Sequence, residues 1–157
     1  MKLAIGCDEA AYNLKTAIIA HLKEKHKEIE IKDFGADAGA VTLYPDIACQ
    51  VADAVAKGTC ERGILVCGTG IGMAICANKV PGIRAAVCHD PFSAERARKS
   101  NNAQIMCMGE RVIGTELAKY LVDIWLRCDF AGGSSAPKVM RIAELEEEYI
   151  RAARCKF

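Results

Sequence analysis

The sequence has few aromatic residues, few prolines and almost no excess of charge. Phe, Trp and Tyr make up 6% of its 157 residues, and only four residues are prolines. Lysines and arginines number 21 and aspartates and glutamates 20, which gives a net charge of +1. A chain so close to neutral has no general attraction for nucleic acid or for an anionic membrane surface. We therefore expect neither partner.

Long apolar runs and paired cysteines are also missing. No stretch approaches the ~18 uncharged apolar residues of a membrane-spanning helix. The opening residues MKLAIG contain one lysine and a short apolar stretch, unlike a secretion signal. The nine cysteines are odd in number and include no CxxC, which argues against a disulfide scaffold and the usual zinc spacing. We expect a reduced, cytoplasmic protein in which most cysteines are small buried residues.

The sequence does contain a regular alternation of short apolar runs and helical periodicities. At ~100–200 residues per domain, residues 1–157 form one domain. The apolar runs predicted to be strands are Lys2–Gly6, Ile29–Phe34, Gly63–Cys67, Ile83–Cys88 and Gln104–Met108. A predicted helix follows each of them, and a last amphipathic helix follows a Gly/Ser/Pro connection over 130–137. This order predicts an α/β fold, a three-layer Rossmann-like doubly wound sandwich with a five-stranded parallel sheet and a C-terminal helix.

A glycine-rich turn, Gly68–Gly72, follows the third predicted strand. Ligands of this fold class bind at the carboxyl ends of the strands. Glycines let backbone N–H groups approach an anion, and the start of the next helix adds a favourable dipole. The spacing matches neither the phosphate loop of nucleotide hydrolases nor the dinucleotide fingerprint. Taken alone, the turn fits an anion site and a plain connection equally well.

Cys67 is the last residue of that strand, and its position favours a chemical role for the turn over a plain connection. A thiol near a helix N-terminus ionises more readily than a free one. Beside N–H groups that can hold an oxyanion, it would act as a nucleophile or as a base next to a carbonyl. His89, at the end of the fourth predicted strand, is the second acid–base candidate, with a hydrogen-bonded structural role as its alternative. His21 and His26 lie in a charged stretch and are expected to be solvated.

Two charged residues near predicted strand ends are candidates for substrate binding. Asp8 would orient sugar hydroxyls or cap the first helix. Arg111 follows the fifth predicted strand and would hold a phosphate or be ordinary surface charge.

Several motifs spread along the chain carry a family resemblance. The most specific is the block Cys67–Gly72 followed by Asn78-Lys79. The others include Gly6-Cys7-Asp8, Leu14-Lys15, Asp33-Phe34-Gly35, Tyr44-Pro45, Asn101-Asn102-Ala103, Gly109–Gly114 and Gly132-Gly133. In these motifs the sequence resembles, nearly end to end, the type B ribose-5-phosphate isomerases, a family that includes galactose-6-phosphate isomerase subunits. The resemblance implies a Rossmann-like enzyme without metal or cofactor that interconverts aldose and ketose phosphates through a cis-enediolate.

The resemblance also implies roles for single residues. Cys67 would be the base that moves a proton between two carbons, and Thr69 would help to stabilise the enediolate. The backbone amides of the turn would assist Thr69, and they belong to Gly70, Ile71 and Gly72. The residues implied to bind the sugar or its phosphate are Asp8, Glu9, Tyr44, Gly68, Ser100, Asn101, Arg111, Ser134 and Lys138. Family members are homodimers or homotetramers whose sites are completed by a neighbouring subunit.

The sequence departs from the family's usual pattern in several places. Glu9 stands where a His is usual, and Ser100 stands where the family has its ring-opening His. Ser134 and Ser135 replace an Arg and a His, and Lys138 replaces a second phosphate-binding Arg. The usual ring-opening acid and part of the phosphate clamp are therefore missing.

Two interpretations of these departures stay open. In the first, His89 replaces the missing acid, and Ser134, Ser135 and the start of the last helix bind the phosphate. In the second, the substrate differs, since a four-carbon keto sugar such as D-erythrulose 4-phosphate closes no stable furanose and needs no ring opening.

We predict a sugar-phosphate aldose–ketose isomerase that acts on a small-molecule sugar phosphate, with ribose 5-phosphate as the default substrate. Erythrulose 4-phosphate or a hexose 6-phosphate is the alternative. A non-catalytic sugar-phosphate-binding subunit is the alternative of another class. A flavodoxin-like nucleotide binder is disfavoured because the glycine turn follows the third predicted strand rather than the first.

Overall fold

The computed structural model describes residues 1–37, 39 and 42–154. Its strands are β1 (Lys2–Cys7), β2 (Glu30–Asp33), β3 (Arg62–Cys67), β4 (Ala85–Val87) and β5 (Ile105–Gly109). Its helices are α1 (Tyr12–Lys25), α2 (Tyr44–Ala56), α3 (Ile71–Ala77), α4 (Pro91–Lys99), α5 (Thr115–Leu126) and α6 (Ala136–Arg154). Two single turns of 3-10 helix, η1 (Glu9–Ala11) and η2 (Gly133–Ser135), precede α1 and α6. The alternation of strands and helices that the sequence predicts is confirmed.

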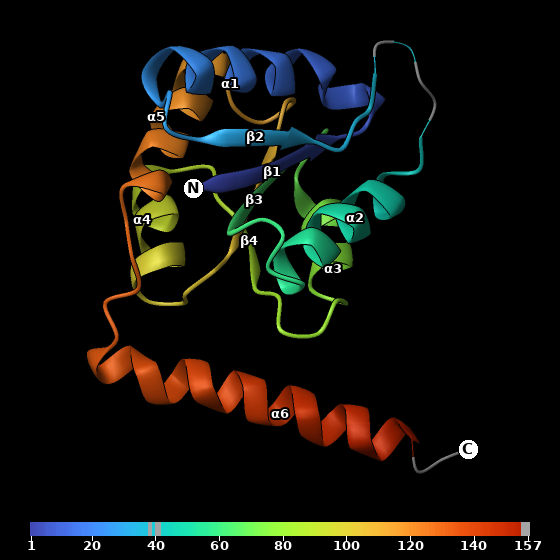
Figure 1. The fold of residues 1–157 in the computed structure, drawn as a ribbon, viewed down its shortest axis with the longest axis vertical. Coiled ribbons are helices and arrows are strands. Elements are labelled where there is room, and N and C mark those ends of the chain that lie inside the picture. Colours follow the sequence, from blue (N-terminus) through green and yellow to red (C-terminus); the bar gives the residue numbers. More distant parts are fainter. Residues whose placement is uncertain (38, 40–41, 155–157) are drawn as a thin grey trace.

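The five strands form one parallel sheet in the order β2-β1-β3-β5-β4 (Figure 1). The first crossover places β2 on one side of β1, and the chain then builds the rest of the sheet on the other side. The order therefore reverses between β1 and β3, which is where ligands bind in sheets of this kind.

Strand β4 is shorter than the predicted run over 83–88. At the start of the strand, side chains form hydrogen bonds with the backbone N–H and C=O groups. The Arg84 N–H donates to Gln104 Oε1 at 2.9 Å, and the Asn78 side-chain amide pairs with both the N–H and the C=O of Ala85 at 2.8 Å. The ladder with β5 consequently begins at Ala85.

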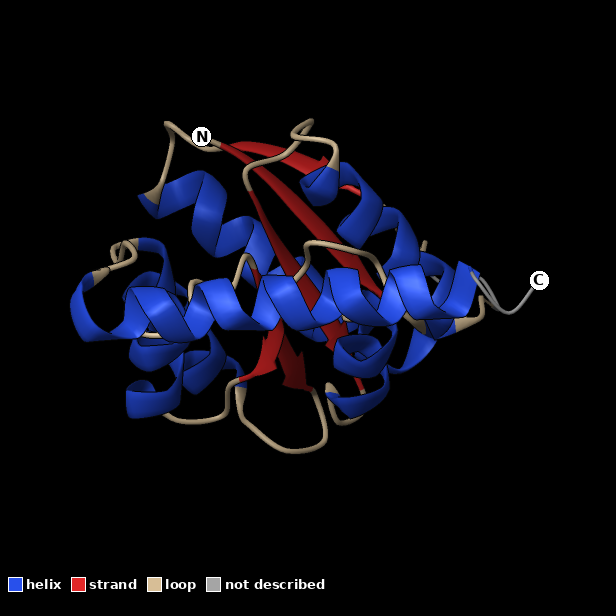
Figure 2. Ribbon diagram, turned by 90° about the horizontal axis from the view of Figure 1, so that it is seen from below, coloured by secondary structure: helices blue, strands red, loops and turns tan. Residues whose placement is uncertain are grey.

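Helices cover both faces of the sheet (Figure 2). One core lies under α1, α4 and α5, and the other lies under α2 and α3. Successive side chains of a strand point to opposite faces. Along β5, Met106 and Met108 accordingly enter the first core, and Ile105 and Cys107 enter the second. The predicted three-layer sandwich is confirmed.

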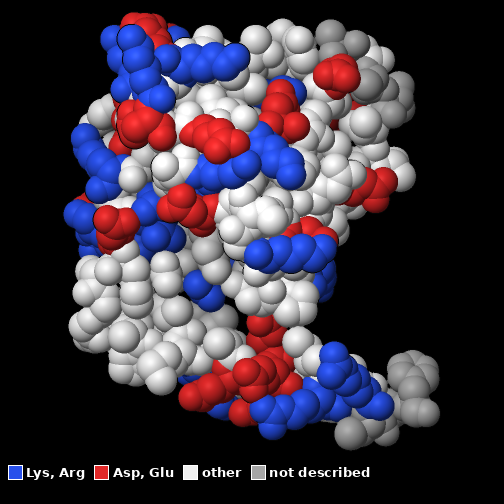
Figure 3. Space-filling view, in the orientation of Figure 1, with Lys and Arg blue, Asp and Glu red and all other residues white. Residues whose placement is uncertain are grey.

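Helix α6 stands apart from this sandwich (Figure 1). None of its residues is buried, and Met140, Ile142 and Tyr149 expose 62%, 46% and 75% of their surface. Figure 3 shows acidic and basic side chains along α6 and a hollow between its C-terminal half and the body. A hydrogen bond from the Gly82 N–H to Glu146 Oε2, at 2.7 Å, links the helix to the body. Among the described residues, no helix has the length and apolarity to cross a membrane.

Candidate active site

The carboxyl edge of the sheet gathers the polar residues that follow β1, β3, β4 and β5. Cys7 of β1 pairs in register with Val66 of β3, and Cys67 pairs with Gly109 of β5. The turn after β3 therefore lies between the segments that follow its two neighbours. This is also the edge at which the strand order reverses.

The Cys67 thiol lies at the bottom of the glycine-rich turn. It is 6% exposed, and the N–H of Gly70 donates to its Sγ at 3.1 Å. Gly70 has φ +77°, and a Cβ there would lie 2.9 Å from the backbone carbon of Met108. Only glycine suits both the left-handed backbone and the close approach to β5. The turn thus aims a backbone donor at the sulfur.

Other cysteines at the strand ends have a different environment. Burial raises the pKa of Cys7 to about 11, although the backbone amide of Ala36 opposes the rise. Burial also raises the pKa of Cys88 to about 12, and that of Cys107 well above its ordinary value. These three thiols are neutral near pH 7 and pack as small apolar side chains. Six of the described cysteines are buried, as the sequence predicts for most of them.

The segment after β5 holds the turn in place. The Glu110 N–H donates to the Cys67 carbonyl at 2.9 Å, and the Arg111 N–H donates to the Gly68 carbonyl at 3.1 Å. A Cβ on Gly109 would lie 2.6 Å from the Cα of Thr69. The absence of a side chain at Gly109 therefore lets the turn rest directly on the end of β5.

The other half of the turn begins α3. The Thr69 hydroxyl accepts a long hydrogen bond of 3.4 Å from the Ile71 N–H. A Cβ on Gly72 would lie 2.6 Å from the Tyr44 ring, so the ring packs against the start of α3. Tyr44 itself begins α2 and is 41% exposed. Thr69, Gly70, Ile71, Gly72 and Tyr44 therefore belong to the same surface as Cys67.

His89 is fixed by the backbone of the neighbouring strand. The Gly109 N–H donates to His89 Nε2 at 3.0 Å. The neutral ring then carries its proton on Nδ1. Burial lowers the pKa of His89, and the charge of Asp90 opposes this effect. His89 is therefore a neutral imidazole near pH 7, with Nδ1–H as the group that remains available.

Asp8 and Arg111 complete this edge. Asp8 is 9% exposed and caps η1 by accepting a hydrogen bond from the Ala10 N–H at 3.1 Å. Burial and the charge of Glu9 raise the pKa of Asp8, whereas Arg111 lowers it. The Arg111 guanidinium packs over Gly68, where an added Cβ would meet it at 3.5 Å. A carboxylate and a guanidinium thus flank the start of the turn.

Four other predicted site residues lie away from the carboxyl edge of the sheet. These are Ser100, Asn101, Ser134 and Lys138. Ser100 caps the end of α4, which leads back to the amino end of β5. The length of β5 separates that end from Gly109, about 13 Å at 3.3 Å per residue. The Ala131 N–H donates to the Lys99 carbonyl at 3.1 Å, so the connection to η2 and α6 also passes the end of α4.

The sequence-based prediction omitted two groups at this edge of the sheet and was wrong about the environment of two histidines. It gave no role to the Gly109 N–H, which orients His89, or to the Glu110 carboxylate, which accepts from the Leu14 N–H at 3.1 Å. A glycine at the end of a buried strand was the available signal for the first. The expected solvation of His21 and His26 is wrong, because both rings are partly buried and bond to one carboxylate.

Comparisons with known proteins agree with this geometry. A family model described as Ribose/Galactose Isomerase matches residues 3–142. Ribose-5-P isomerase B of Listeria innocua is 56% identical, over 94% of this chain and 99% of that protein. D-erythrulose-4-phosphate isomerase of Pectobacterium atrosepticum is 52% identical, over 94% and 97%. The structure of Clostridium thermocellum ribose-5-phosphate isomerase B superposes with a TM-score of 0.91 at 48% identity, covering 95% of this chain and 99% of that one.

Proposed function

Since this chain belongs to the ribose/galactose isomerase family, we propose that it interconverts ribose 5-phosphate and ribulose 5-phosphate through a cis-enediolate. The observation that carries the proposal is the Gly70 N–H, 3.1 Å from Cys67 Sγ, in a turn lined with backbone donors. A base and an oxyanion site side by side are what proton transfer next to a carbonyl requires. The relative from Listeria innocua, named ribose-5-P isomerase B, supports this choice of substrate.

The proposed reaction moves one proton between two carbons. The Cys67 thiolate removes the proton from C2 of the open-chain aldose, and the C–H electron pair forms the C1–C2 double bond of the enediolate. The carbonyl electrons move onto O1, where the turn stabilises the negative charge. The thiol returns its proton to C1, and the O2 proton passes to O1. The product is the ketose, and the thiolate is restored.

Residues around the turn would bind the substrate. Thr69 and the N–H groups of the turn would stabilise the developing oxyanion, and Tyr44 closes the side of the turn over Gly72. Asp8 accepts hydrogen bonds from sugar hydroxyls. Arg111 supplies positive charge next to Gly68. Glu9 follows Asp8 at the same edge and adds a second carboxylate.

His89 would act as a hydrogen-bond donor to a sugar oxygen. Its Nε2 already accepts from the Gly109 N–H, so Nδ1–H is the atom left for the substrate. Burial lowers the pKa of His89 and keeps the ring neutral near pH 7. This suits orientation of a carbonyl or hydroxyl better than delivery of a proton to open a sugar ring.

One observation favours a second substrate, D-erythrulose 4-phosphate. The chain has Ser100 where the family has its ring-opening His, and a four-carbon keto sugar needs no ring opening. The relative from Pectobacterium atrosepticum, named D-erythrulose-4-phosphate isomerase, is nearly as similar to this chain as the one from Listeria innocua.

A substrate panel separates these candidates. We would measure kcat/KM for ribose 5-phosphate, erythrulose 4-phosphate, allose 6-phosphate and galactose 6-phosphate with the purified chain. We expect the highest value for ribose 5-phosphate. A higher value for erythrulose 4-phosphate would overturn the substrate while leaving the isomerase intact. Binding without turnover of any of the four would instead indicate a non-catalytic sugar-phosphate-binding subunit.

The protein would work as a homodimer, alone or within a homotetramer, in the cytoplasm. Helix α6 has 19 residues and buries none of them, and its apolar residues Met140 and Tyr149 face solvent. The body exposes large apolar side chains too, with Phe92 71% and Tyr120 51% exposed. A second copy would cover such surfaces. It would also bring its own Ser134 and Lys138, which the fold keeps away from Cys67 in a single chain.

A further inference from the structure

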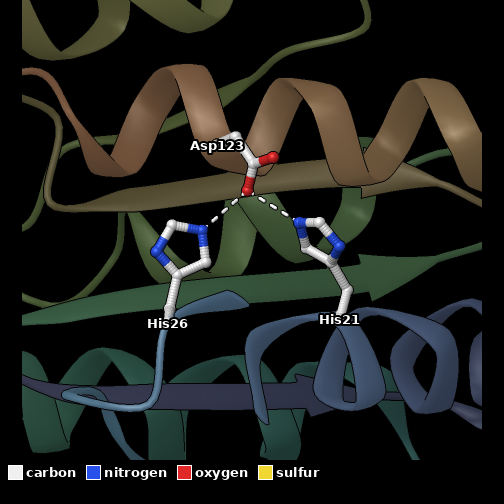
Figure 4. A group of neighbouring side chains, drawn as sticks. All are labelled: His21, His26 and Asp123. Atoms are coloured by element: carbon white, nitrogen blue, oxygen red, sulfur yellow. Dashed lines mark hydrogen bonds and ion pairs between the residues drawn. The ribbon is translucent and has the colours of Figure 1, made fainter. Parts of the chain in front are cut away.

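A cluster of three side chains that could ligate a metal lies between the ends of α1 and α5 (Figure 4). His21 is on the last turns of α1, and His26 is the residue that ends this helix. Asp123 is on the last turns of α5. Helices α1 and α5 both begin beyond carboxyl ends of strands and run back toward the amino ends. The cluster therefore takes no part in the proposed reaction.

Both imidazoles point at one oxygen atom. His21 Nε2 lies 2.7 Å from Asp123 Oδ1, and His26 Nε2 lies 2.8 Å from the same atom. One potential ligand atom from each residue lies within 4.8 Å of the other two. The end of α1 makes this convergence possible, because His26 leaves helical geometry, with φ −127° and ψ 56°. A regular helix would turn side chains five residues apart to different sides.

The environment suits a bound dication. The side chains of His21, His26 and Asp123 are 13%, 23% and 35% exposed, so they are held by packing yet remain reachable. Asp123 Oδ1 is the atom that both imidazole rings share. Glu28 Oε1, 3.7 Å from His26 Nδ1, adds negative charge behind that ring.

We propose that His21, His26 and Asp123 form a binding site for a transition-metal dication such as Zn²⁺, with water completing the coordination. Two imidazole nitrogens and one carboxylate oxygen are a ligand set that zinc sites use with an open position. Zn²⁺ binds such ligand atoms at about 2.0–2.2 Å, so the two nitrogens and the oxygen would have to separate to about 3.3–3.5 Å to admit the ion between them. The metal would tie the end of α1 to α5 and thereby stabilise the fold without changing the reaction.

The test must separate this site from the cysteines, which also bind zinc. Chelator-treated protein would be titrated with Zn²⁺ by calorimetry and with Co²⁺ by visible absorption, which distinguishes nitrogen and oxygen ligands from thiolate. Cys49 is exposed, so Cys49→Ser is the matched control. We expect one ion per chain in the unmodified protein and in Cys49→Ser. We also expect affinity at least tenfold lower in His26→Gln and in Asp123→Asn.

Thermal unfolding gives an independent readout. Zn²⁺ should raise the melting temperature of the unmodified protein and of Cys49→Ser, but not of the two site variants, since a ligand stabilises the state that binds it. Binding that persists in the site variants, a thiolate spectrum, or no binding at millimolar Zn²⁺ would each overturn the proposal.

Discussion

The predicted site residues form two groups, one held in place by contacts within the chain and one that has few such contacts. At the carboxyl edge, backbone contacts from β5 fix the turn and His89, and the Gly70 N–H is already aimed at the Cys67 sulfur. Ser134 and Lys138, by contrast, sit on η2 and α6, where no residue is buried. The first group needs nothing beyond one chain to be in position. The second has little in its own chain to position it, which explains why it would act in a neighbour's site.

This difference sets the kind of experiment that each group requires. Damage at the carboxyl edge should abolish chemistry within the chain that carries it. A substitution on α6 should reduce activity at a site that lies mainly in another chain. Mixing with chains that have an intact α6 should therefore restore activity.

Replacing the sulfur at the centre of the first group should have the largest effect. Cys67→Ala removes the proposed base, so kcat/KM should fall by about 10³-fold, within the range for loss of a general base. The free energy of unfolding should fall by about 1–3 kcal/mol, because a small buried atom is lost and the Gly70 N–H loses its acceptor. Initial rates and a denaturant titration would check both expectations.

Cys88→Ala is the matched control for that variant. Cys88 is also buried and also lies at the end of a strand, but burial keeps its thiol neutral by raising its pKa to about 12. Its loss should cost stability and leave kcat/KM nearly unchanged. An active Cys67→Ala variant would show that the proton moves on another group.

Disturbing the support of the turn should cost less than removing the sulfur. In Gly109→Ala, the new Cβ would lie 2.6 Å from Thr69 Cα and 2.8 Å from the Gly68 carbonyl oxygen, so the turn must shift. We expect kcat/KM to fall by about 10²-fold, as for a misplaced catalytic group. Gly114→Ala is the control, because a Cβ there meets nothing within 4 Å. Equal losses in both variants would contradict the role given to Gly109.

The second group can be tested by mixing two inactive variants. Cys67→Ala lacks the base, and Lys138→Glu puts a negative charge where a phosphate is expected. If each site combines Cys67 of one chain with Lys138 of another, random mixing should restore about a quarter of the sites. Activity would be followed after the mixed chains are unfolded and refolded together. No recovery, with both variants folded and dimeric by light scattering, would place Lys138 outside the partner's site.

The features that sequence predicts well are those with a local cause. The apolar run of β3 and the glycines after it both have reasons within a few residues, and the structure has them where expected. Asp8 also caps η1, one of the two roles given to it in advance.

The features that sequence leaves open depend on distant segments. The separation of Ser100 and Asn101 from Cys67 follows from the direction in which α4 returns along the sheet, which no local pattern contains. The partner of His21 and His26 is about a hundred residues away, on α5. A charged local sequence therefore suggested solvated rings, whereas the tertiary fold pairs them with Asp123.

The smallest expected effect belongs to His89, and its pH dependence makes it measurable. Burial lowers the pKa of His89 below the ordinary 6.5, so the ring should stay neutral and activity should hold as pH falls through 6.5 toward the lowered pKa. Below it, protonation of Nε2 removes the acceptor of the Gly109 N–H, and both activity and this group's contribution to stability should decline. The sign follows from linkage, because a lowered pKa in the folded state means that the unfolded state binds the proton more tightly.

His89→Gln keeps an acceptor for the Gly109 N–H, whereas His89→Leu leaves that donor unpaired. An unpaired buried donor costs roughly 1–3 kcal/mol, so His89→Leu should be less stable than His89→Gln by about that amount, and both variants should lose severalfold in kcat/KM. In His89→Gln the acid limb should also move to lower pH, since the amide does not titrate. An unchanged acid limb would assign that titration to another group, with Asp8 the next candidate because burial raises its pKa.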